Sequence, residues 1–382
     1  MINETEALAA FCERQRHAEF ITVDTEFIRD KTYWPRLCVV QVAGPEEAVA
    51  IDALAEGLDL APLLELLYEP KVLKVFHAAR QDIEIFVNLT GKVPAPLFDT
   101  QIAAMVCGFG EQVGYDVLAQ KLVGVRIDKS SRFTDWARRP LSEKQLRYAL
   151  DDVVHLRGAY EGLIKRLKRD ERVHWLDDDM AALADPNQYR TQPEDAWRRL
   201  KSRSHNPRYL GILREIAAWR EREAQRRDLP RNRILRDEAL FEIAAEAPRD
   251  AEQLAGLRTV GRGFAEGRLG PDLLEAVARG VALPEAELPH VERPEPPPQG
   301  IGPLVDLLKV LLKMKCDAHG VAQRVVADSE DLERIAAEEE PDLPALKGWR
   351  RELFGNDALA LKAGRLALAA HGSKIVLLAP VG

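Results

Sequence analysis

The sequence predicts an α/β domain at the N-terminus followed by two small all-α domains. Over roughly the first 160 residues, short runs rich in β-branched residues alternate with segments of helical apolar spacing, as in α/β domains. After about residue 185 no further strand is expected, and helical patterns continue on both sides of a proline-rich spacer. The expected units are residues 1–185, a connecting segment over 186–206, residues 207–287, a linker over 288–300 and residues 301–382.

The individual elements follow from local patterns. Strands are expected where β-branched residues cluster, over residues 20–27, 36–43, 48–53 and 71–79. Helices are expected over residues 59–70, 80–90 and 142–170, where apolar residues recur every three or four positions. Gly91 closes the second of these helices, and Ser142 is placed to cap the third. Shorter helices are expected over residues 206–228, 234–248, 250–257, 271–280 and 302–320.

Composition narrows the class of protein. Of the 382 residues, 46% are hydrophobic and 30% charged, which is typical of chains that bury ordinary cores. No apolar run approaches the roughly 18 residues that a membrane span requires, and the acidic N-terminus argues against an export signal. The four cysteines are far apart and form no C-x-x-C pair, so we expect reduced thiols, no zinc site and a cytoplasmic location.

The net charge of −8 conceals a strongly basic segment. Between Trp197 and Arg236 there are 13 lysines or arginines against 4 acids, and Trp197, Tyr209 and Trp219 are interleaved with them. A polyanion binds where positive charge is concentrated on the surface, so this segment is expected to contact nucleic acid. The alternative is a solvated arginine-rich helix face.

The first expected strand ends in an unusual pair of acids, Asp24 and Glu26. Successive side chains of a strand alternate faces, so the two carboxylates point the same way, about 7 Å apart. Two like charges beside an apolar strand repel each other and lose hydration. A lone D-x-E at a strand end would more often simply face solvent, so the interpretation depends on what accompanies it.

Three further residues accompany the pair. Asp82 lies in the first turn of a helix, where a carboxylate also complements the helix dipole. Tyr148 and Asp152 are four residues apart, hence on one helix face about 6 Å apart, whereas Asp151 points about 100° away. Oxygen-only ligands suit Mg²⁺ or Mn²⁺, and two such ions about 4 Å apart support phosphodiester hydrolysis. The acids therefore predict a metal site for phosphoryl chemistry.

Three segments of the chain also resemble a known family. VDTEF, HAARQDIEIF and DKSSRFTDWARRPLSEKQLRYALDD are similar to the three exonuclease motifs of the DEDD superfamily, in its tyrosine-bearing subclass. The pattern D-W-x-x-R-P-L-S ahead of Y-x-x-x-D resembles the bacterial ribonuclease D family in particular. The unit from residue 207 to about 280 resembles an HRDC (helicase and ribonuclease D C-terminal) domain, and the final unit a second, more diverged HRDC-like domain.

The resemblance implies a ribonuclease H-like mixed sheet flanked by helices and a 3′→5′ exoribonuclease. Asp24, Glu26, Asp82 and Asp152 would hold two divalent cations, Mg²⁺ or Mn²⁺, and Tyr148 would orient or help deprotonate the attacking water. Nucleoside 5′-monophosphates would be released from a single-stranded RNA 3′ end. The expected enzyme is a monomer that acts on structured RNA such as tRNA precursors.

Other residues have two interpretations each. Phe27 is expected to pack in the core, with stacking on the terminal base as the alternative. Lys129 and Arg139 are candidate phosphate contacts, or else solvated surface charges. Arg226 and Arg227, in the basic segment, are candidate RNA contacts with the same alternative.

Three neighbours of the motifs are expected to be structural. His77 follows the fourth strand and is expected to be hydrogen-bonded rather than a metal ligand, because four carboxylates already supply the site. Asp99 precedes a helix and is expected to cap it. Trp136 is expected to pack.

Two alternatives to an exoribonuclease remain at this point. The first is a 3′→5′ exonuclease that acts mainly on DNA, since the same site and HRDC domains also occur in DNA repair proteins. The second is a module that has lost catalysis and tethers RNA for another enzyme, against which the intact set of five residues argues. An ATP-driven helicase is not expected, because the chain has no G-x-x-x-x-G-K-[ST] motif.

Overall fold

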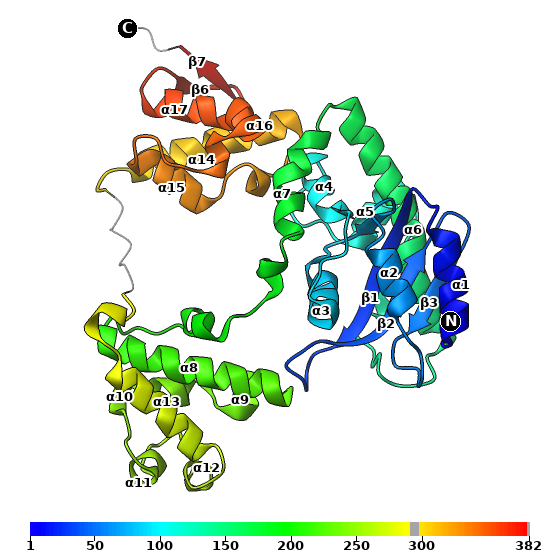
Figure 1. The fold of residues 1–382 in the computed structure, drawn as a ribbon. Coiled ribbons are helices and arrows are strands. Elements are labelled where there is room, and N and C mark those ends of the chain that lie inside the picture. The colour runs from blue at the N-terminus through cyan, green and yellow to red at the C-terminus, as the bar shows by residue number, and fades with distance from the viewer. Residues whose placement is uncertain (291–297, 380–382) are drawn as a thin grey trace.

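The structure, a computed structural model, describes residues 1–290 and 298–379. A sheet-containing N-terminal domain, a helical unit built around α8 and a C-terminal unit built around α14 are visible as separate bodies (Figure 1). Of the predicted linker over 288–300, residues 291–297 lie outside the described residues.

The N-terminal domain contains a mixed five-stranded sheet of order β3-β2-β1-β4-β5. Strand β2 runs antiparallel to both of its neighbours, β1 and β3, whereas β4 and β5 are parallel to β1. The expected mixed sheet with flanking helices is therefore confirmed. The strands are β1 (Phe20–Ile28), β2 (Arg36–Ala43), β3 (Ala48–Asp52), β4 (Leu73–Phe76) and β5 (Leu97–Asp99).

Helices cover both faces of this sheet (Figure 1). The three predicted helices of the domain form as α2, α3 and α6, and Gly91 is the left-handed cap of α3. Sequence patterns did not indicate α1, α5, α7 or the short strand β5, and α4 was indicated only by the expected cap at Asp99. The helices are α1 (Thr5–Gln15), α2 (Ala61–Leu67), α3 (Arg80–Thr90), α4 (Thr100–Val106), α5 (Tyr115–Leu122), α6 (Glu143–Arg169) and α7 (Asp177–Leu183).

Alternation along β1 assigns its side chains to two different layers. Ile21 and Val23 belong to the core beneath α1, α2 and α3. Phe20 belongs to the core on the opposite face, and the Thr22 hydroxyl donates to the carbonyl oxygen of Val153 in α6, at 2.7 Å. Because side chains of a strand alternate faces, the residues at positions 24 and 26 face α6 as well.

The second unit is entirely helical and has its own core. Leu213, Ile216 and Leu240 are fully buried there. All four helices predicted between residues 206 and 280 form, together with two additional short ones. They are α8 (Pro207–Arg227), α9 (Arg231–Ile234), α10 (Asp237–Glu246), α11 (Ala251–Ala255), α12 (Arg262–Ala265) and α13 (Gly270–Ala282).

The C-terminal unit corrects one expectation. Helices α14 (Gly302–His319), α15 (Ser329–Ala337), α16 (Gly348–Arg350) and α17 (Asn356–Lys362) are followed by a hairpin of β6 (Ala367–His371) and β7 (Lys374–Leu378). The unit is therefore not all-α. Its alanine-rich sixth strand has neither a β-branched run nor clear alternation, so local pattern did not reveal it.

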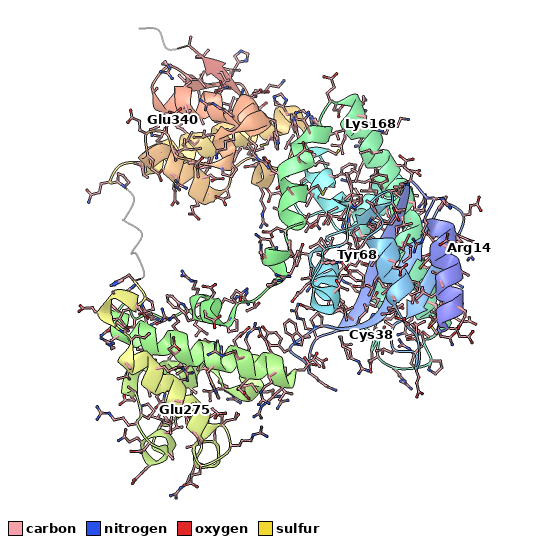
Figure 2. The ribbon with its side chains drawn as sticks, viewed as in Figure 1. Arg14, Cys38, Tyr68, Lys168, Glu275 and Glu340 are labelled. Atoms are coloured by element: carbon pink, nitrogen blue, oxygen red, sulfur yellow. The ribbon has the colours of Figure 1, made fainter. Side chains whose placement is uncertain are left out.

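Both C-terminal units contact the N-terminal domain. Trp349 stacks on Trp175 with ring centroids 4.2 Å apart, and Arg350 pairs with Asp179 of α7 at 2.7 Å. On the other side, the loop between β1 and β2 reaches α8, where the backbone N–H groups of Tyr33 and Trp34 donate to Asp228 at 3.0 and 2.9 Å. Side chains fill the junction between this loop and α8 (Figure 2).

Two other expectations can be compared with the described residues. All four cysteines are free thiols, as expected. None of the described helices combines the length and the apolar character needed to cross a membrane.

Candidate active site

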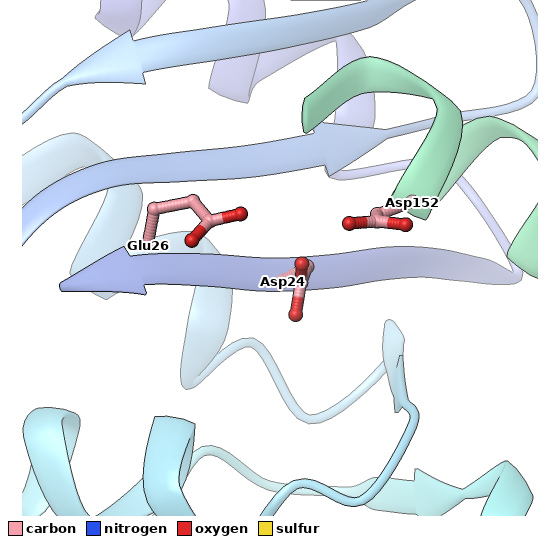
Figure 3. A group of neighbouring side chains, drawn as sticks. All are labelled: Asp24, Glu26 and Asp152. Atoms are coloured by element: carbon pink, nitrogen blue, oxygen red, sulfur yellow. The ribbon is translucent and has the colours of Figure 1, made fainter. Parts of the chain in front are cut away.

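Three carboxylates from two elements converge at one end of β1. Asp24 and Glu26 project from β1 and Asp152 from α6 (Figure 3). Each offers a carboxylate oxygen, and these oxygens lie within 4.8 Å of one another. The pairing of β1 with β2 becomes irregular between Glu26 and Phe27, so the strand is regular through both acids and bends directly after them.

Asp82 approaches from the other face of β1. It is buried in the first turn of α3, and the hydroxyl of Thr25 donates to its carboxylate. The loop before α3 is held by Asp99, which accepts from the backbone N–H groups of Ala78 and Ala79 at 3.0 and 2.8 Å. Asp99 also caps α4, as expected, and thereby fixes the start of the helix that carries Asp82.

Tyr148 and Asp152 share one face of α6, as their spacing predicts. The helix begins in a capping box, in which Ser142 and Gln145 each accept a hydrogen bond from the other's backbone N–H. Asp152 is buried, whereas Asp151 on the neighbouring face lies 3.7 Å from His155 instead. The face that α6 turns toward β1 therefore determines which acid of the pair enters the site.

All five residues line one cavity of about 680 Å³. Phe27 and Lys129 belong to the same wall, so two of the five candidate substrate contacts lie where the prediction requires. The Lys129 ammonium pairs with Asp116 at 2.6 Å and is nearly half exposed. Phe27 packs partly in the core, as expected, and also lines the cavity, so its stacking on the terminal base remains a prediction.

The carboxylates of the site, of which Asp82 and Asp152 are buried and Asp24 and Glu26 half-buried, have strongly perturbed pKa values. Burial raises the pKa of Asp24 to about 6. Burial together with the charge of Asp24 raises the pKa of Asp152 to about 8, and burial with the charges of three neighbouring aspartates raises that of Glu26 to about 10. The pKa of Asp82 also lies well above its usual range, through burial and the charge of Asp24. The cluster holds more negative charge than its surroundings stabilise.

This donor set fits divalent metal ions. The ligand atoms are all carboxylate oxygens, they lie close together, and their charges repel one another. The arginine whose charge lowers the pKa of both Glu26 and Asp152 is Arg132, and it offsets only part of the repulsion. Hard, oxygen-preferring cations such as Mg²⁺ and Mn²⁺ would supply the missing positive charge.

Sequence patterns missed two residues of the cavity wall, Arg132 and Phe133. Phe133 is 90% exposed, and the Arg132 guanidinium lies 5.2 Å from its ring centroid. Both belong to an irregular loop after the short helical turn Lys129–Ser131, which has no periodic signal. A phenylalanine that directly follows an arginine, ahead of D-W-x-x-R-P, was the available sequence signal.

Arg139 does not belong to this site. Its guanidinium donates to both carboxylate oxygens of Asp52, at 2.8 and 2.5 Å, and to the carbonyl oxygen of Cys38 at 2.9 Å. The hydrogen bonds of this guanidinium are thus already made to residues at the edge of the sheet. Arg139 is neither a phosphate contact nor a solvated charge. Both interpretations of this residue were wrong, because they ignored the buried carboxylate that the fold places beside it.

We expect Arg139→Ala to lower the free energy of unfolding by about 2–3 kcal/mol, because Asp52 would be left buried without its partner. Chemical denaturation measures this change. The exposed neighbour Arg138 provides the matched control, and Arg138→Ala should change stability little. A loss of RNA affinity in Arg139→Ala without a loss of stability would contradict the structural role.

The basic segment is less available than its composition indicates. Arg226 and Arg227 both pair with Glu223, at 2.8 and 2.7 Å, so contact of either with RNA remains a prediction. Trp197 and Trp219 are buried in the core of the helical unit, where Tyr209 also packs. The interleaved aromatic residues therefore serve packing and are not a stacking surface.

The remaining structural expectations hold. His77 lines the cavity, but both ring nitrogens have partners, the Thr100 hydroxyl at 2.9 Å and the Val113 carbonyl oxygen at 3.1 Å. Trp136 is buried and packs beside Tyr148. Neither competes with the carboxylates for a metal.

Comparison with known proteins assigns the chain. Residues 1–168 match the family model of 3′–5′ exonucleases, and residues 210–277 that of HRDC domains. The chain is 58% identical over 378 residues to the ribonuclease D of Acidiphilium cryptum, which covers 98% of this chain and 96% of that protein. The ribonuclease D of Gluconacetobacter diazotrophicus is 55% identical over 375 residues, covering 98% and 95%. The chain belongs to the ribonuclease D family.

A solved structure of the family agrees with the fold. The crystal structure of Escherichia coli RNase D superposes with a TM-score of 0.79 at 31% identity, covering 95% of this chain and 98% of that one. Membership of the ribonuclease D family and the exonuclease match make the protein a ribonuclease of the 3′–5′ exonuclease type.

Proposed function

We propose that the protein is a metal-dependent 3′→5′ exoribonuclease that uses two divalent cations, Mg²⁺ or Mn²⁺, and releases nucleoside 5′-monophosphates. The observation that carries the proposal is the convergence of Asp24, Glu26 and Asp152 in a cavity that Asp82 and Tyr148 also line. Because these acids are buried or half-buried and repel one another, they fit a binding site for cations better than a structural ion-pair network.

The chain's own residues would divide the chemistry among them. Divalent ions bound by Asp24, Glu26, Asp82 and Asp152 would activate a water and stabilise the departing oxygen. Burial and the neighbouring carboxylates raise the pKa of Tyr148, so its hydroxyl keeps its proton at neutral pH. Tyr148 would orient the attacking water by hydrogen bonding or help to remove its proton. The four carboxylates alone would hold the cations.

The cavity wall offers side chains that would hold the RNA end. Phe27 and the exposed Phe133 offer aromatic faces for unpaired bases, and Lys129 and Arg132 offer charge for the backbone. Stacking on these faces requires bases that are not paired, so the substrate would be a single-stranded 3′ end. The E. coli relative is described as an exoribonuclease involved in structured RNA processing. We extend this to tRNA precursors, processed in the cytoplasm by a monomeric enzyme.

The proposal is tested with a 5′-labelled RNA that carries a hairpin and a short 3′ tail. With Mg²⁺ or Mn²⁺ we expect stepwise loss of the tail and a stop near the hairpin, and no shortening with chelator. A DNA strand of matched sequence should be degraded more slowly. Faster loss of the DNA would favour a DNA exonuclease, and RNA that binds but never shortens would favour a tethering module.

A further inference from the structure

A second polar pocket lies beside the active site, where the loop between β1 and β2 meets α3 and the helical unit. It has a volume of about 230 Å³. Four guanidinium groups face it, and we call it the arginine pocket after them. They belong to Arg29, Arg80, Arg199 and Arg231.

The arginine pocket carries surplus positive charge. Arg29 pairs with Glu84 at 2.5 Å, and Arg231 pairs with Glu221 at 2.6 Å. Arg80 and Arg199 are exposed, and among the residues that the structure describes no carboxylate lies within 4.0 Å of either guanidinium. Two of the four arginines that line the pocket therefore have no carboxylate in direct contact, which leaves N–H groups of both guanidinium groups available to a phosphate.

The unpaired arginines are held in place by neutral partners. Arg80 donates to the carbonyl oxygen of Gln188 at 3.2 Å and lies 5.7 Å from the ring centroid of Tyr189. Arg199 donates to the hydroxyl of Thr191 at 3.1 Å. Each guanidinium keeps further N–H groups for a ligand, because an arginine has five. Contacts with neutral groups orient each guanidinium group without neutralising its charge.

The pocket is also connected to the candidate active site. Arg29 lies in the wall of the 680 Å³ catalytic cavity, of the arginine pocket and of a third cavity of about 380 Å³ on the helical unit. Arg199 and Arg231 line both of the latter two. Three neighbouring cavities thus extend from the carboxylates across the loop between β1 and β2 toward α8 and α9.

We propose that the arginine pocket binds a backbone phosphate of the RNA strand, on the 5′ side of the bond that is cleaved. This inference rests on the proposed function, since it assumes that the RNA 3′ end lies at the carboxylates. A strand whose end is there must leave the cavity along one wall, and the wall at Arg29 leads to the unpaired charges. The pocket would position the strand between the exonuclease domain and the HRDC domain.

The test compares single-stranded RNAs of two to twelve nucleotides. Binding is measured by fluorescence anisotropy with chelator present, so that no catalysis is required, and KM and kcat are measured with Mg²⁺. The variants are Arg80→Ala, Arg199→Ala and the double variant. Arg249→Ala, which removes an exposed arginine from the HRDC domain outside both pockets, is the matched control.

We expect the double variant to bind the longer RNAs about tenfold more weakly and to bind the shortest RNA as the wild type does. The difference in affinity between the double variant and the wild type should appear at the RNA length at which the strand first reaches the pocket. The kcat of the double variant should equal that of the wild type. The slope of log affinity against log salt should fall by about 0.7 for each phosphate that the protein no longer neutralises. Lysine at both positions should restore most of the slope, which a purely structural role would not require.

Several results would overturn the proposal. These are an equal loss of affinity at every RNA length, an equal loss in Arg249→Ala, or no RNA binding by the wild type. Weaker stabilisation by inorganic phosphate in the double variant, with unchanged RNA binding, would assign the pocket to a free anion. If the wild type binds RNA without shortening it, the proposed function fails, while the length dependence of binding still decides the pocket.

Discussion

Asp152→Asn should abolish nucleotide release, whereas the same change one residue earlier, Asp151→Asn, should leave it nearly intact. Asp152 is buried, with a carboxylate oxygen within 4.8 Å of those of Asp24 and Glu26. Asp151 lies on another face of α6, beside His155. Losing one carboxylate from a site of this kind should lower kcat on the order of a thousandfold. Release of 5′-monophosphates from RNA with a labelled 3′ end measures the rate.

The pair of adjacent substitutions separates chemistry from folding. Both remove one acid from the same helix turn, so a general loss of helix stability would affect them alike. Asp24→Asn should behave as Asp152→Asn does. In contrast, Tyr148→Phe should retain measurable activity, because it removes a hydroxyl that orients water and no metal ligand. Equal activity of the Asp151 and Asp152 variants would show that the acidic cluster does not hold the catalytic ions.

The metal-free protein should lose stability as the pH rises from about 5 to 9, and divalent cations should restore it. The pKa values of Asp24, Asp152 and Glu26 are raised in the folded protein, to about 6, 8 and 10. A carboxyl group with a raised pKa stabilises the fold below its unfolded value, and this contribution is lost as the pH rises through the folded value. Bound cations remove the repulsion that causes the loss.

Thermal unfolding of the exonuclease domain measures both effects. At pH 8.5, Mn²⁺ at about a hundred times its dissociation constant should raise the melting temperature by about 5–10 °C, and at pH 5.5 by much less. Glu26→Gln should be more stable than the wild type without metal at pH 8.5, and should gain little from Mn²⁺. Glu275→Gln, an exposed change on α13 (Figure 2), should behave as the wild type. An increase in melting temperature that is equal at both pH values would contradict the prediction that Mn²⁺ acts by relieving repulsion between ionised carboxylates.

Much of the site is local in origin and could be predicted. The alternation of β1 places Asp24 and Glu26 on one face whatever surrounds the strand, and the four-residue spacing places Tyr148 above Asp152. The cap at Ser142 also depends only on that residue and on Gln145, three positions later. Such features depend on backbone geometry within a turn or a strand, which the sequence encodes directly.

Other features depended on partners distant in the chain. Arg139 resembles a surface charge until the fold brings Asp52 to it, 87 residues away. The strand β6 exists because β7 pairs with it, and the exposure of Phe133 depends on a loop without periodicity. The sequence also did not show which arginines of the basic segment are available to a ligand, because that depends on which of them pair with acids in the fold.

The sequence by itself therefore singled out five candidate site residues, the elements that carry four of them in regular alternation or helical spacing, and the carboxylate oxygens that they would offer to a cation. Tertiary structure alone decided that Asp24, Glu26 and Asp152 meet, that Asp82 approaches from the opposite face of β1, and that Arg80 and Arg199 face one pocket. The physical reason is range. Backbone periodicity acts over a few residues, whereas the burial and charge pairing that set a side chain's role are summed over everything packed around it.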